Sequence, residues 1–168
     1  MSLSLDLAAA LTPLVGQSFV PAHTVSVNDG NGMELTLLVE SVEAVGVACE
    51  ELRLNVPSLA ASTMDVLKRW AAGLCQRVTY LLETLQPLEY DEQGNEILIR
   101  SNPPDTSSLP GQAKYYEVQL ASQGGGRFTL RRYLAERGVP GRSPTPLRLT
   151  HEQLAKLVND LVATLPTP

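Results

Sequence analysis

The first third of the chain alternates hydrophobic and polar residues, which is the pattern of strands with one buried face. Between Met33 and Val39 every second residue is apolar, and polar residues such as Glu34 and Thr36 fall between them. Successive side chains of a strand point to opposite faces of a sheet, so this spacing predicts a half-buried strand. Strands are expected over residues 19–27, 33–42 and 47–56. Residues 28–32 (NDGNG) tolerate positive φ, which predicts a tight hairpin loop between the first two strands.

A helical period follows this meander. Apolar residues recur at three- to four-residue spacing from Thr63 to Leu85, among them Trp70, Leu74 and Leu82. Pro87 prevents a continuation of the helix, because proline lacks the N–H that the next turn would need. The pattern predicts a long central helix whose apolar stripe packs on the inner face of the sheet.

Two further helices are expected towards the two ends of the sequence. Residues 3–14 have an amphipathic helical pattern, and Gly16 is placed to stop it. Thr150 and Gln153 have the spacing of a capping box, in which each side chain hydrogen-bonds to the other residue's backbone N–H. This motif predicts a C-terminal helix that runs to about Leu165.

The second half of the chain predicts a second strand meander. Strands are expected over residues 88–90, 96–100, 115–120 and 128–134. Residues 101–112 are rich in proline and serine and are expected to form a surface loop. The last strand has an alternative, because residues 129–138 also fit a short helix that stops at Gly138. We favour the strand, since the run Gly124–Gly126 before it suits a hairpin turn.

The order of these elements indicates an α+β fold. Antiparallel runs of strands with segregated helices are typical of that class. We expect a single domain over residues 1–168, with an antiparallel sheet of about six to seven strands in two meanders, a long central helix and a C-terminal helix packed on it.

Composition is that of a folded protein. Of the 168 residues, 43% are hydrophobic and 18% are charged, close to the globular average. No apolar run approaches the roughly 20 residues of a membrane span, and the first residues lack the basic region of a signal peptide. Cys49 and Cys75 are expected as free, buried thiols, with a disulfide between them as the minor alternative. We therefore expect a cytoplasmic protein, and the compact, cysteine-poor composition suggests a bacterial source.

Charge is divided unevenly along the chain. Residues 1–126 carry six basic and fifteen acidic side chains and residues 127–168 carry seven basic and three acidic ones, so net charges of −9 and +4 sum to −5. Guanidinium groups bind carboxylates and phosphates, so the basic stretch is the candidate recognition surface. Its expected partner-binding residues are Arg127, Arg131, Arg132, Tyr133, Arg137 and Arg142. The alternative is that these arginines pair with acids of neighbouring strands, such as Glu89, Glu96 and Glu117.

The sequence contains none of the common motifs for catalysis, metal binding or nucleotide binding. His23 and His151 are far apart, and neither a paired-cysteine motif nor a P-loop occurs. Gly124–Arg127 could cradle an anion, but a phosphate loop opens a helix, and a strand is expected after these glycines. We therefore expect no enzymatic activity, no metal and no cofactor.

Three functions are compatible with this pattern. The first is a non-catalytic protein-interaction module, such as an adaptor, a chaperone-like or an immunity-like protein, whose arginines favour an acidic protein partner. The second is a small-molecule-binding domain with an apolar pocket between the sheet and the central helix. The third, nucleic-acid binding through the arginine cluster, is opposed by the net negative charge of the chain. A homodimer is a further expectation, because an exposed meander edge can be covered by dimerisation.

Overall fold

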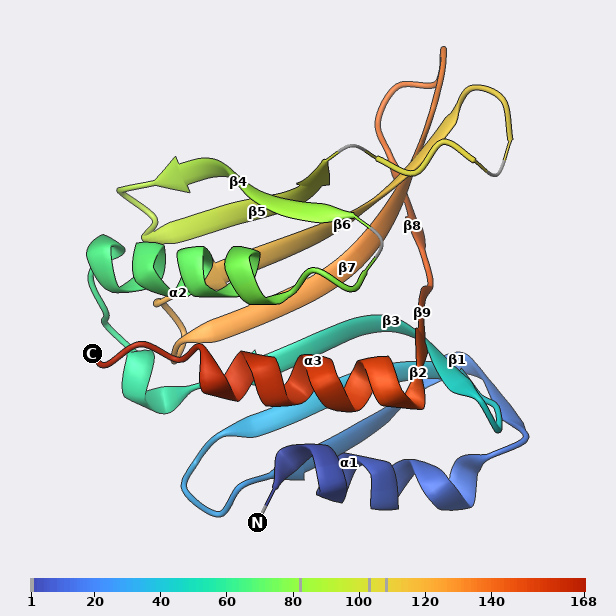
Figure 1. Cartoon of the computed structure of the whole chain (residues 1–168), viewed down its shortest axis with the longest axis horizontal. Helices are drawn as coiled ribbons and strands as arrows, with labels where there is room; N and C mark the ends of the chain where they lie inside the picture. Colours follow the sequence, from blue (N-terminus) through green and yellow to red (C-terminus); the bar gives the residue numbers. More distant parts are fainter. Residues whose placement is uncertain (1, 82, 103, 108) are drawn as a thin grey trace.

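Three helices lie against one antiparallel sheet in the computed structural model, which describes residues 2–81, 83–102, 104–107 and 109–168 (Figure 1). Within these residues the α-helices are α1 (Leu3–Leu11), α2 (Met64–Arg77) and α3 (His151–Ala163). The strands are β1 (Gln17–Asn28), β2 (Glu34–Val42), β3 (Gly46–Asn55), β4 (Thr84–Asp91), β5 (Glu96–Asn102), β6 (Gln112–Ala121), β7 (Arg127–Glu136), β8 (Ser143–Thr145) and β9 (Leu147–Thr150). The predicted antiparallel α+β class is confirmed, and the nine-stranded sheet is larger than expected.

The sheet joins two meanders through its central strands. Its order is β1-β2-β3-β7-β6-β5-β4, and β3 and β7 pair antiparallel over residues 52–55 and 127–130. Beyond these pairs, β8 pairs with β7 whereas β9 pairs with β3, so the segment that carries both short strands completes the middle of the sheet (Figure 1). Neither short strand was predicted, because both are short and Pro144 and Pro146 interrupt the alternation of residues.

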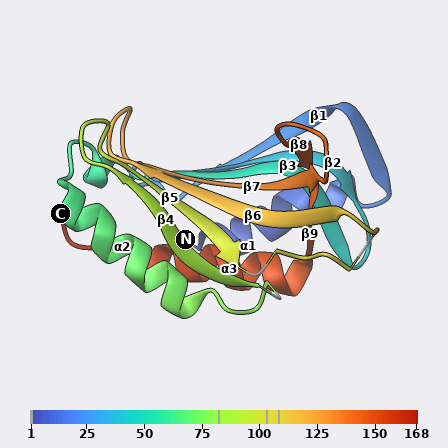
Figure 2. The same cartoon turned by 90° about the horizontal axis from the view of Figure 1, so that it is seen from above.

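The hydrophobic core lies between the sheet and the helices. Helix α2 contacts β4, β5 and β6, α1 contacts β1, and α3 contacts α1, β3 and β9. Trp70 and Leu74 of α2 and Leu157 of α3 are at most 1% exposed. Figure 2 shows all three helices on the same side of the sheet. The opposite side, here called the open face, carries the candidate site.

The central helix is shorter than the sequence predicts. The apolar spacing predicts a helix from Thr63 to Leu85, whereas α2 ends at Arg77. Leu85 belongs to strand β4, and its side chain is buried in the same core as the apolar side chains of α2. It therefore fits the apolar spacing of the helix although it is not helical. The β-branched pair Val78-Thr79 is unfavourable in a helix. The predicted helix also includes Leu82, which lies outside the described residues.

Polar contacts hold the chain at both ends of α2. At its start, the Thr63 hydroxyl accepts a hydrogen bond from the Val66 N–H at 3.4 Å and caps the helix. Beyond its end, the buried Asp160 carboxylate of α3 accepts hydrogen bonds from Arg77 Nε and from the Tyr80 hydroxyl, each at 2.8 Å. Burial, together with this hydrogen bond, raises the pKa of the Tyr80 phenol. Asp160 therefore ties the end of α2 to α3.

The terminal helices follow the predictions with shifted bounds. Helix α1 ends at Leu11, and a short 3-10 turn occupies Thr12–Leu14. The predicted capping box is present: the Gln153 N–H donates to the Thr150 hydroxyl and the Thr150 N–H donates to the Gln153 side chain, each at 3.0 Å. Helix α3 therefore begins where the sequence motif places it.

The sequence left a strand over residues 128–134 and a helix over residues 129–138 as alternatives, and residues 127–136 form a strand. This segment forms β7 and pairs with β6 along its whole length. Gly126 in the preceding turn has a φ of +70°, a conformation that favours glycine. It also faces the Val56 carbonyl so closely that a side chain would clash.

The predicted surface loop over residues 101–112 is shortened by strand pairing at both of its ends. Strand β5 extends to Asn102, and β6 begins at Gln112. Asp105 and Lys114 form an isolated antiparallel bridge, with both backbone N–H···O distances at 2.8 Å. Residues 103 and 108 of the predicted loop lie outside the described residues.

Candidate partner-binding face

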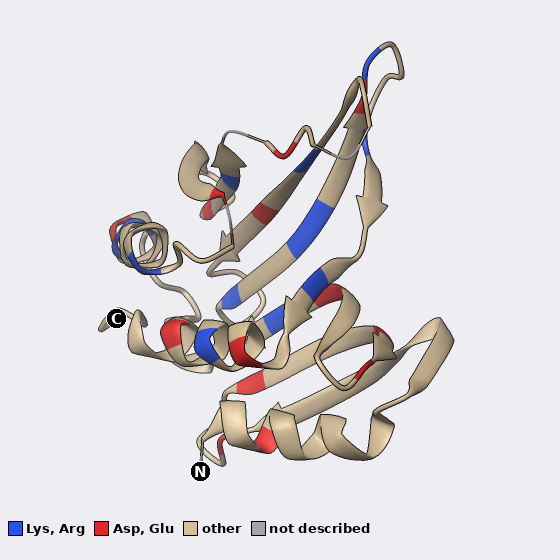
Figure 3. Cartoon of the chain, turned by 45° about the vertical axis from the view of Figure 1, so that its right-hand side comes forward, with Lys and Arg blue, Asp and Glu red and all other residues tan. Residues whose placement is uncertain are grey.

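Strand alternation places arginines on the open face of the sheet. Phe128 and Leu130 of β7 are buried in the core, so Arg127 and Arg131 point to the opposite side. Arg53 of β3 lies between two buried leucines and points the same way. Figure 3 shows basic positions along β7 and acidic positions on the strands beside it. The open face therefore combines arginines of β7 with charged residues of its neighbours.

Charges alternate across the middle of this face. The strand registers pair Glu117 of β6 with Arg131 of β7 and with Arg100 of β5. Arg131 Nη2 lies 2.5 Å from one carboxylate oxygen of Glu51 on β3, and Arg53 Nη2 lies 2.5 Å from the other. Arg100 Nη2 lies 3.2 Å from Glu117. Each of the two carboxylates is therefore held by arginines from its own or neighbouring strands.

Arg142 folds over the open face from the turn between β7 and β8. Its guanidinium donates hydrogen bonds to both carboxylate oxygens of Glu117, and these bonds raise its pKa. Arg142 Cζ lies 3.8 Å from the ring centroid of Tyr133, and Arg100 Cζ lies 4.7 Å from that of Tyr115. The two tyrosine rings, with centroids 6.0 Å apart, are each only 9% exposed. They form a floor beneath the arginines.

The arginines of this face are exposed or half-buried, whereas the acids that bind them are covered. We call the following set the basic face: Arg53, Arg100, Arg127, Arg131 and Arg142. The side chain of Arg131 is 46% exposed, but that of its partner Glu51 is only 6% exposed. Arg142 and Glu117 differ in the same way, with side-chain exposures of 37% and 11%. Positive charge therefore faces solvent here, although the net charge of the chain is −5.

The structure separates the six residues that the sequence grouped as a partner-binding site. Four of them lie on the open face: Arg127, Arg131, Tyr133 and Arg142. Arg137 is exposed in the turn after β7, and Arg132 points to the helix side of the sheet. Sequence reasoning missed Arg53 and Arg100, which lie outside the basic stretch. The signal for both was their position between buried residues of a strand.

Arg132 lines a cavity of about 450 Å³ on the helix side of the sheet, beside residues 104–107. Its Nη1 donates a hydrogen bond to the Tyr116 hydroxyl at 2.6 Å, and its Nη2 lies 3.6 Å from the carboxylates of both Glu83 and Asp105. Burial raises the pKa of the Glu83 carboxyl, although the Arg132 charge acts in the opposite direction. Arg132 is therefore enclosed by acids of its own chain.

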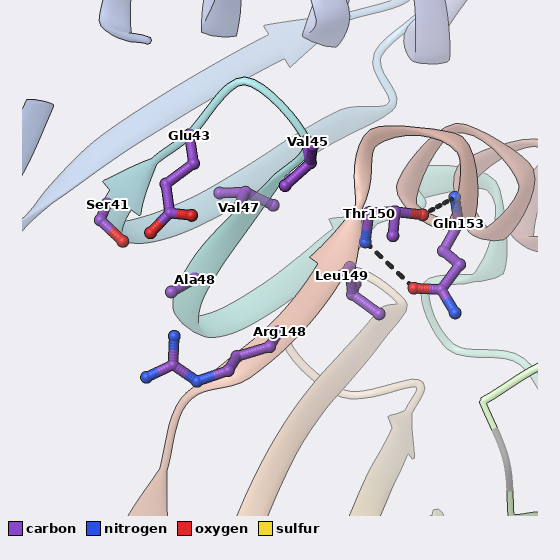
Figure 4. A pocket seen from close by; sticks show the side chains of 10 residues that line it. Ser41, Glu43, Val45, Val47, Ala48, Arg148, Leu149, Thr150 and Gln153 are labelled. Carbon is purple, nitrogen blue, oxygen red and sulfur yellow. Dashed lines mark hydrogen bonds between the residues drawn. The ribbon is translucent and has the colours of Figure 1, made fainter. Parts of the chain in front are cut away.

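An open cavity of about 230 Å³ lies between the β2–β3 turn and the start of α3 (Figure 4). Glu43 and Arg148 line one part of it, and the capping residues Thr150 and Gln153 line another. The hydrogen bonds that Figure 4 marks join the two capping residues to each other. The polar groups of Thr150 and Gln153 are therefore already paired, so this part of the cavity does not indicate a ligand.

Side chains that often act as nucleophiles or ligands are buried or far apart. Cys49 and Cys75 are free thiols, and burial raises the pKa of Cys49 to about 12, so it is protonated at neutral pH. His23 lies on β1, whereas His151 begins α3, with its Nε2 2.8 Å from the Glu43 carbonyl oxygen. Among the described residues, no three His, Cys, Asp or Glu side chains are grouped to hold a metal ion.

Comparison with known proteins identifies no relative. No protein family, no curated protein and no solved structure matches this chain. Over the part of the chain that the structure describes, the helices are too short or too polar to cross a membrane. The chemistry of the open face is therefore the feature of this chain that bears on its function.

Proposed function

We propose that this protein is a non-catalytic interaction module, of the adaptor, chaperone-like or immunity-like kind, that binds an acidic segment of another protein on the basic face. The observation that carries the proposal is the exposure of the arginines above covered carboxylates, as in Arg131 and Glu51. An acidic segment laid across β5, β6, β7 and β3 would meet guanidinium groups on three of these strands and on the turn after β7.

Electrostatics and pre-organisation both support an acidic partner. Exposed charges of one sign steer a partner of opposite charge and fix its register on the surface. The guanidinium groups of Arg131 and Arg142 are already held by Glu51 and Glu117. Side chains that are held in place before binding lose less conformational entropy on association. Their planar groups also bind carboxylates through two parallel hydrogen bonds.

The interior supports the interaction module over the small-molecule alternative. That alternative needs an apolar pocket between the sheet and α2. The space there, which Leu74, Ile99 and Phe128 help to line, has a volume of about 10 Å³. Such a cavity holds at most about one water molecule. An apolar ligand would have to separate α2 from the sheet before it could bind.

The tyrosines of the open face support a protein partner over a nucleic acid. Single-stranded nucleic acids are bound by stacking of their bases on exposed aromatic rings. Tyr115 and Tyr133 are covered by Arg100 and Arg142, so their faces are not free for bases. The net charge of −5 also disfavours a polyanion as the partner.

Affinity capture with matched arginine variants tests this function. Wild type, Arg127→Glu and Arg137→Glu are each immobilised, and the retained proteins and nucleic acids are identified by mass spectrometry and sequencing. Neither arginine has an ion-pair partner among the described residues, so both changes spare internal pairing. Arg127 belongs to the basic face, whereas Arg137 lies in the turn beyond it.

The expected result is an acidic protein that wild type and Arg137→Glu retain and Arg127→Glu releases. The retained complex should also weaken as the salt concentration rises, because salt screens exposed charges. Equal retention by all three proteins would place the interface elsewhere and contradict the proposal. Retention of nucleic acid alone would support the third candidate function instead.

A further inference from the structure

A small pocket within the basic face gathers three arginines around one threonine. The pocket has a volume of about 100 Å³ and lies where β3, β7, β6 and β5 run side by side. Thr129 of β7 pairs with Arg53 on β3 and with Gln119 on β6. Arg127 and Arg131 lie two residues to either side of Thr129 on the same strand and line the pocket with it.

Several arginine N–H groups at this pocket have no acceptor. Arg127 has no ion-pair partner among the described residues. Arg53 and Arg131 share the single carboxylate of Glu51. The Nε of Arg53 is buried and makes no hydrogen bond. A buried donor without an acceptor is destabilising, so the guanidinium groups here are incompletely satisfied by the chain itself.

The charges around the pocket sum to a small positive value. Arg53, Arg127 and Arg131 contribute +3, while Glu51 beneath them and Glu96 at the pocket contribute −2, which leaves +1. One negative charge balances this excess. A carboxylate carries one negative charge, whereas a phosphate monoester carries about −1.5 to −2 at neutral pH. A phosphate would also lie beside the Glu96 carboxylate, so the charge balance favours a carboxylate.

We propose that this pocket binds one side-chain carboxylate of the acidic partner segment, with Arg127 as its main hydrogen-bond donor. The inference rests on the proposed function and names its anchor point. The free guanidinium of Arg127 can donate two parallel hydrogen bonds to a carboxylate. Arg53 of β3 and Arg131 of β7 add positive charge, and Thr129, which lies between Arg127 and Arg131 on β7, has a hydroxyl that is a neutral donor.

Nuclear magnetic resonance of the full chain tests the pocket directly. The Arg Nε–Hε signals of the ¹⁵N-labelled protein are followed while a hexaglutamate peptide is added at constant ionic strength. The signals of Arg127 and Arg53 should shift, and that of Arg137 should not. Arg127→Gln should weaken peptide binding by about tenfold or more, the effect of losing hydrogen bonds to a charged group. Arg137→Gln is the matched control and should bind as wild type does.

Two additions separate charge from geometry and confirm folding. Arg127→Lys keeps the positive charge but cannot form the two parallel hydrogen bonds, so it should bind with an affinity between those of wild type and Arg127→Gln. A hexaglutamine peptide should leave all arginine signals unchanged. The backbone amide spectrum of each variant should match that of wild type outside the pocket, which shows that the sheet is intact.

Three outcomes would overturn the pocket. Equal binding of hexaglutamate by wild type and Arg127→Gln would show that the anchor lies elsewhere on the basic face. Inorganic phosphate that binds more tightly than the peptide would show that the ligand class is wrong. Absence of any arginine shift up to about 10 mM peptide would exclude useful affinity. The two proposals can also fail separately. If hexaglutamate binds at Arg127 but affinity capture retains no acidic protein, the pocket binds carboxylates and the proposed function is wrong.

Discussion

Arg131 and Glu51 lie side by side across the strand pair that joins the two meanders. Arg131 Nε lies 2.7 Å from Glu51 Oε2, and the two residues are 80 positions apart in the sequence. Arg53 binds the other oxygen of the same carboxylate. Glu51 is therefore a covered acid that the exposed Arg131 and the half-buried Arg53 share. This arrangement makes Glu51 important for stability and leaves the arginines on the surface for recognition.

Replacing Glu51 should destabilise the sheet. Glu51→Gln removes the charge that separates Arg53 from Arg131 and leaves two guanidinium groups close together. We expect a loss of about 1–3 kcal/mol in the free energy of unfolding, less than for a fully buried pair because the arginines are partly exposed. Urea denaturation measures it. Glu34→Gln, at an exposed residue of β2, should change stability by no more than about 0.5 kcal/mol.

Reversing two adjacent arginines should affect both faces of the sheet at once. In Arg131→Glu/Arg132→Glu, one new acid meets Glu51 on the open face, and the other meets Glu83 and Asp105 on the helix side. We expect the melting temperature to fall by about 5 °C or more. Arg137→Glu, in the exposed turn, should melt as wild type does. An unchanged melting temperature for the double variant would show that neither arginine stabilises the fold.

A cavity in the core should be costly. Leu74 of α2 is 1% exposed and lies between the helix and the sheet, so Leu74→Ala leaves a void that its neighbours fill only in part. We expect unfolding in urea to show a loss of about 2–5 kcal/mol. Leu5→Ala is the control, because Leu5 of α1 is largely exposed. If Leu74→Ala and Leu5→Ala lower the free energy of unfolding by similar, small amounts, α2 does not pack on the sheet in solution.

Stability should depend on pH through Glu83. Burial raises the pKa of this carboxyl above its ordinary value of 4.5, so the folded protein binds a proton more tightly there than the unfolded chain does. The stabilisation by the proton bound at Glu83 is fully present below pH 4.5, the ordinary pKa, and is lost as the pH rises through the raised pKa. Glu83→Gln should therefore gain stability relative to wild type between about pH 4 and pH 7.

Urea midpoints of both proteins across this pH range measure the effect of Glu83. If wild type instead gains stability relative to Glu83→Gln as the pH rises, the ion pair with Arg132 outweighs burial. In Arg132→Gln, the loss of stability towards neutral pH should be larger than in wild type, because the Glu83 carboxylate then lacks its nearest positive charge.

Alternation of residues predicted β2 and β3 nearly in full, whereas only residues 88–90 of β4 (Thr84–Asp91) were predicted as a strand. Alternation also indicated one feature of the site that was overlooked. Alternation puts Arg53 on the face of β3 opposite to that of the buried Leu52 and Leu54, and so predicts that Arg53 lies on the open face. The same rule separates Arg131 from Arg132, because neighbours in a strand point to opposite faces. Grouping all the arginines of the basic stretch into one surface ignored this rule, and Arg132 lies on the helix side.

Long-range contacts account for what the sequence could not show. The pairing of β3 with β7 brings Glu51 to Arg131, and hydrophobic alternation alone does not specify which strands become neighbours. The contact of Asp160 with Arg77 at the end of α2 also joins residues far apart, here 83 positions in the sequence. The apolar spacing runs on through Leu85 because a helix and the strand after it bury residues in one core.

The position of β8 and β9 sets the order in which the sheet can be completed as the chain is made. Both meanders precede Ser143, and until residues 143–150 leave the ribosome only the pairs at 52–55 and 127–130 can join them. Residues 46–49 of β3 and 132–134 of β7, in the two central strands, therefore receive their partner strands last. Until then, the backbone N–H and C=O groups on one edge of these residues have no partner strand, and unpaired edges of this kind favour association between chains.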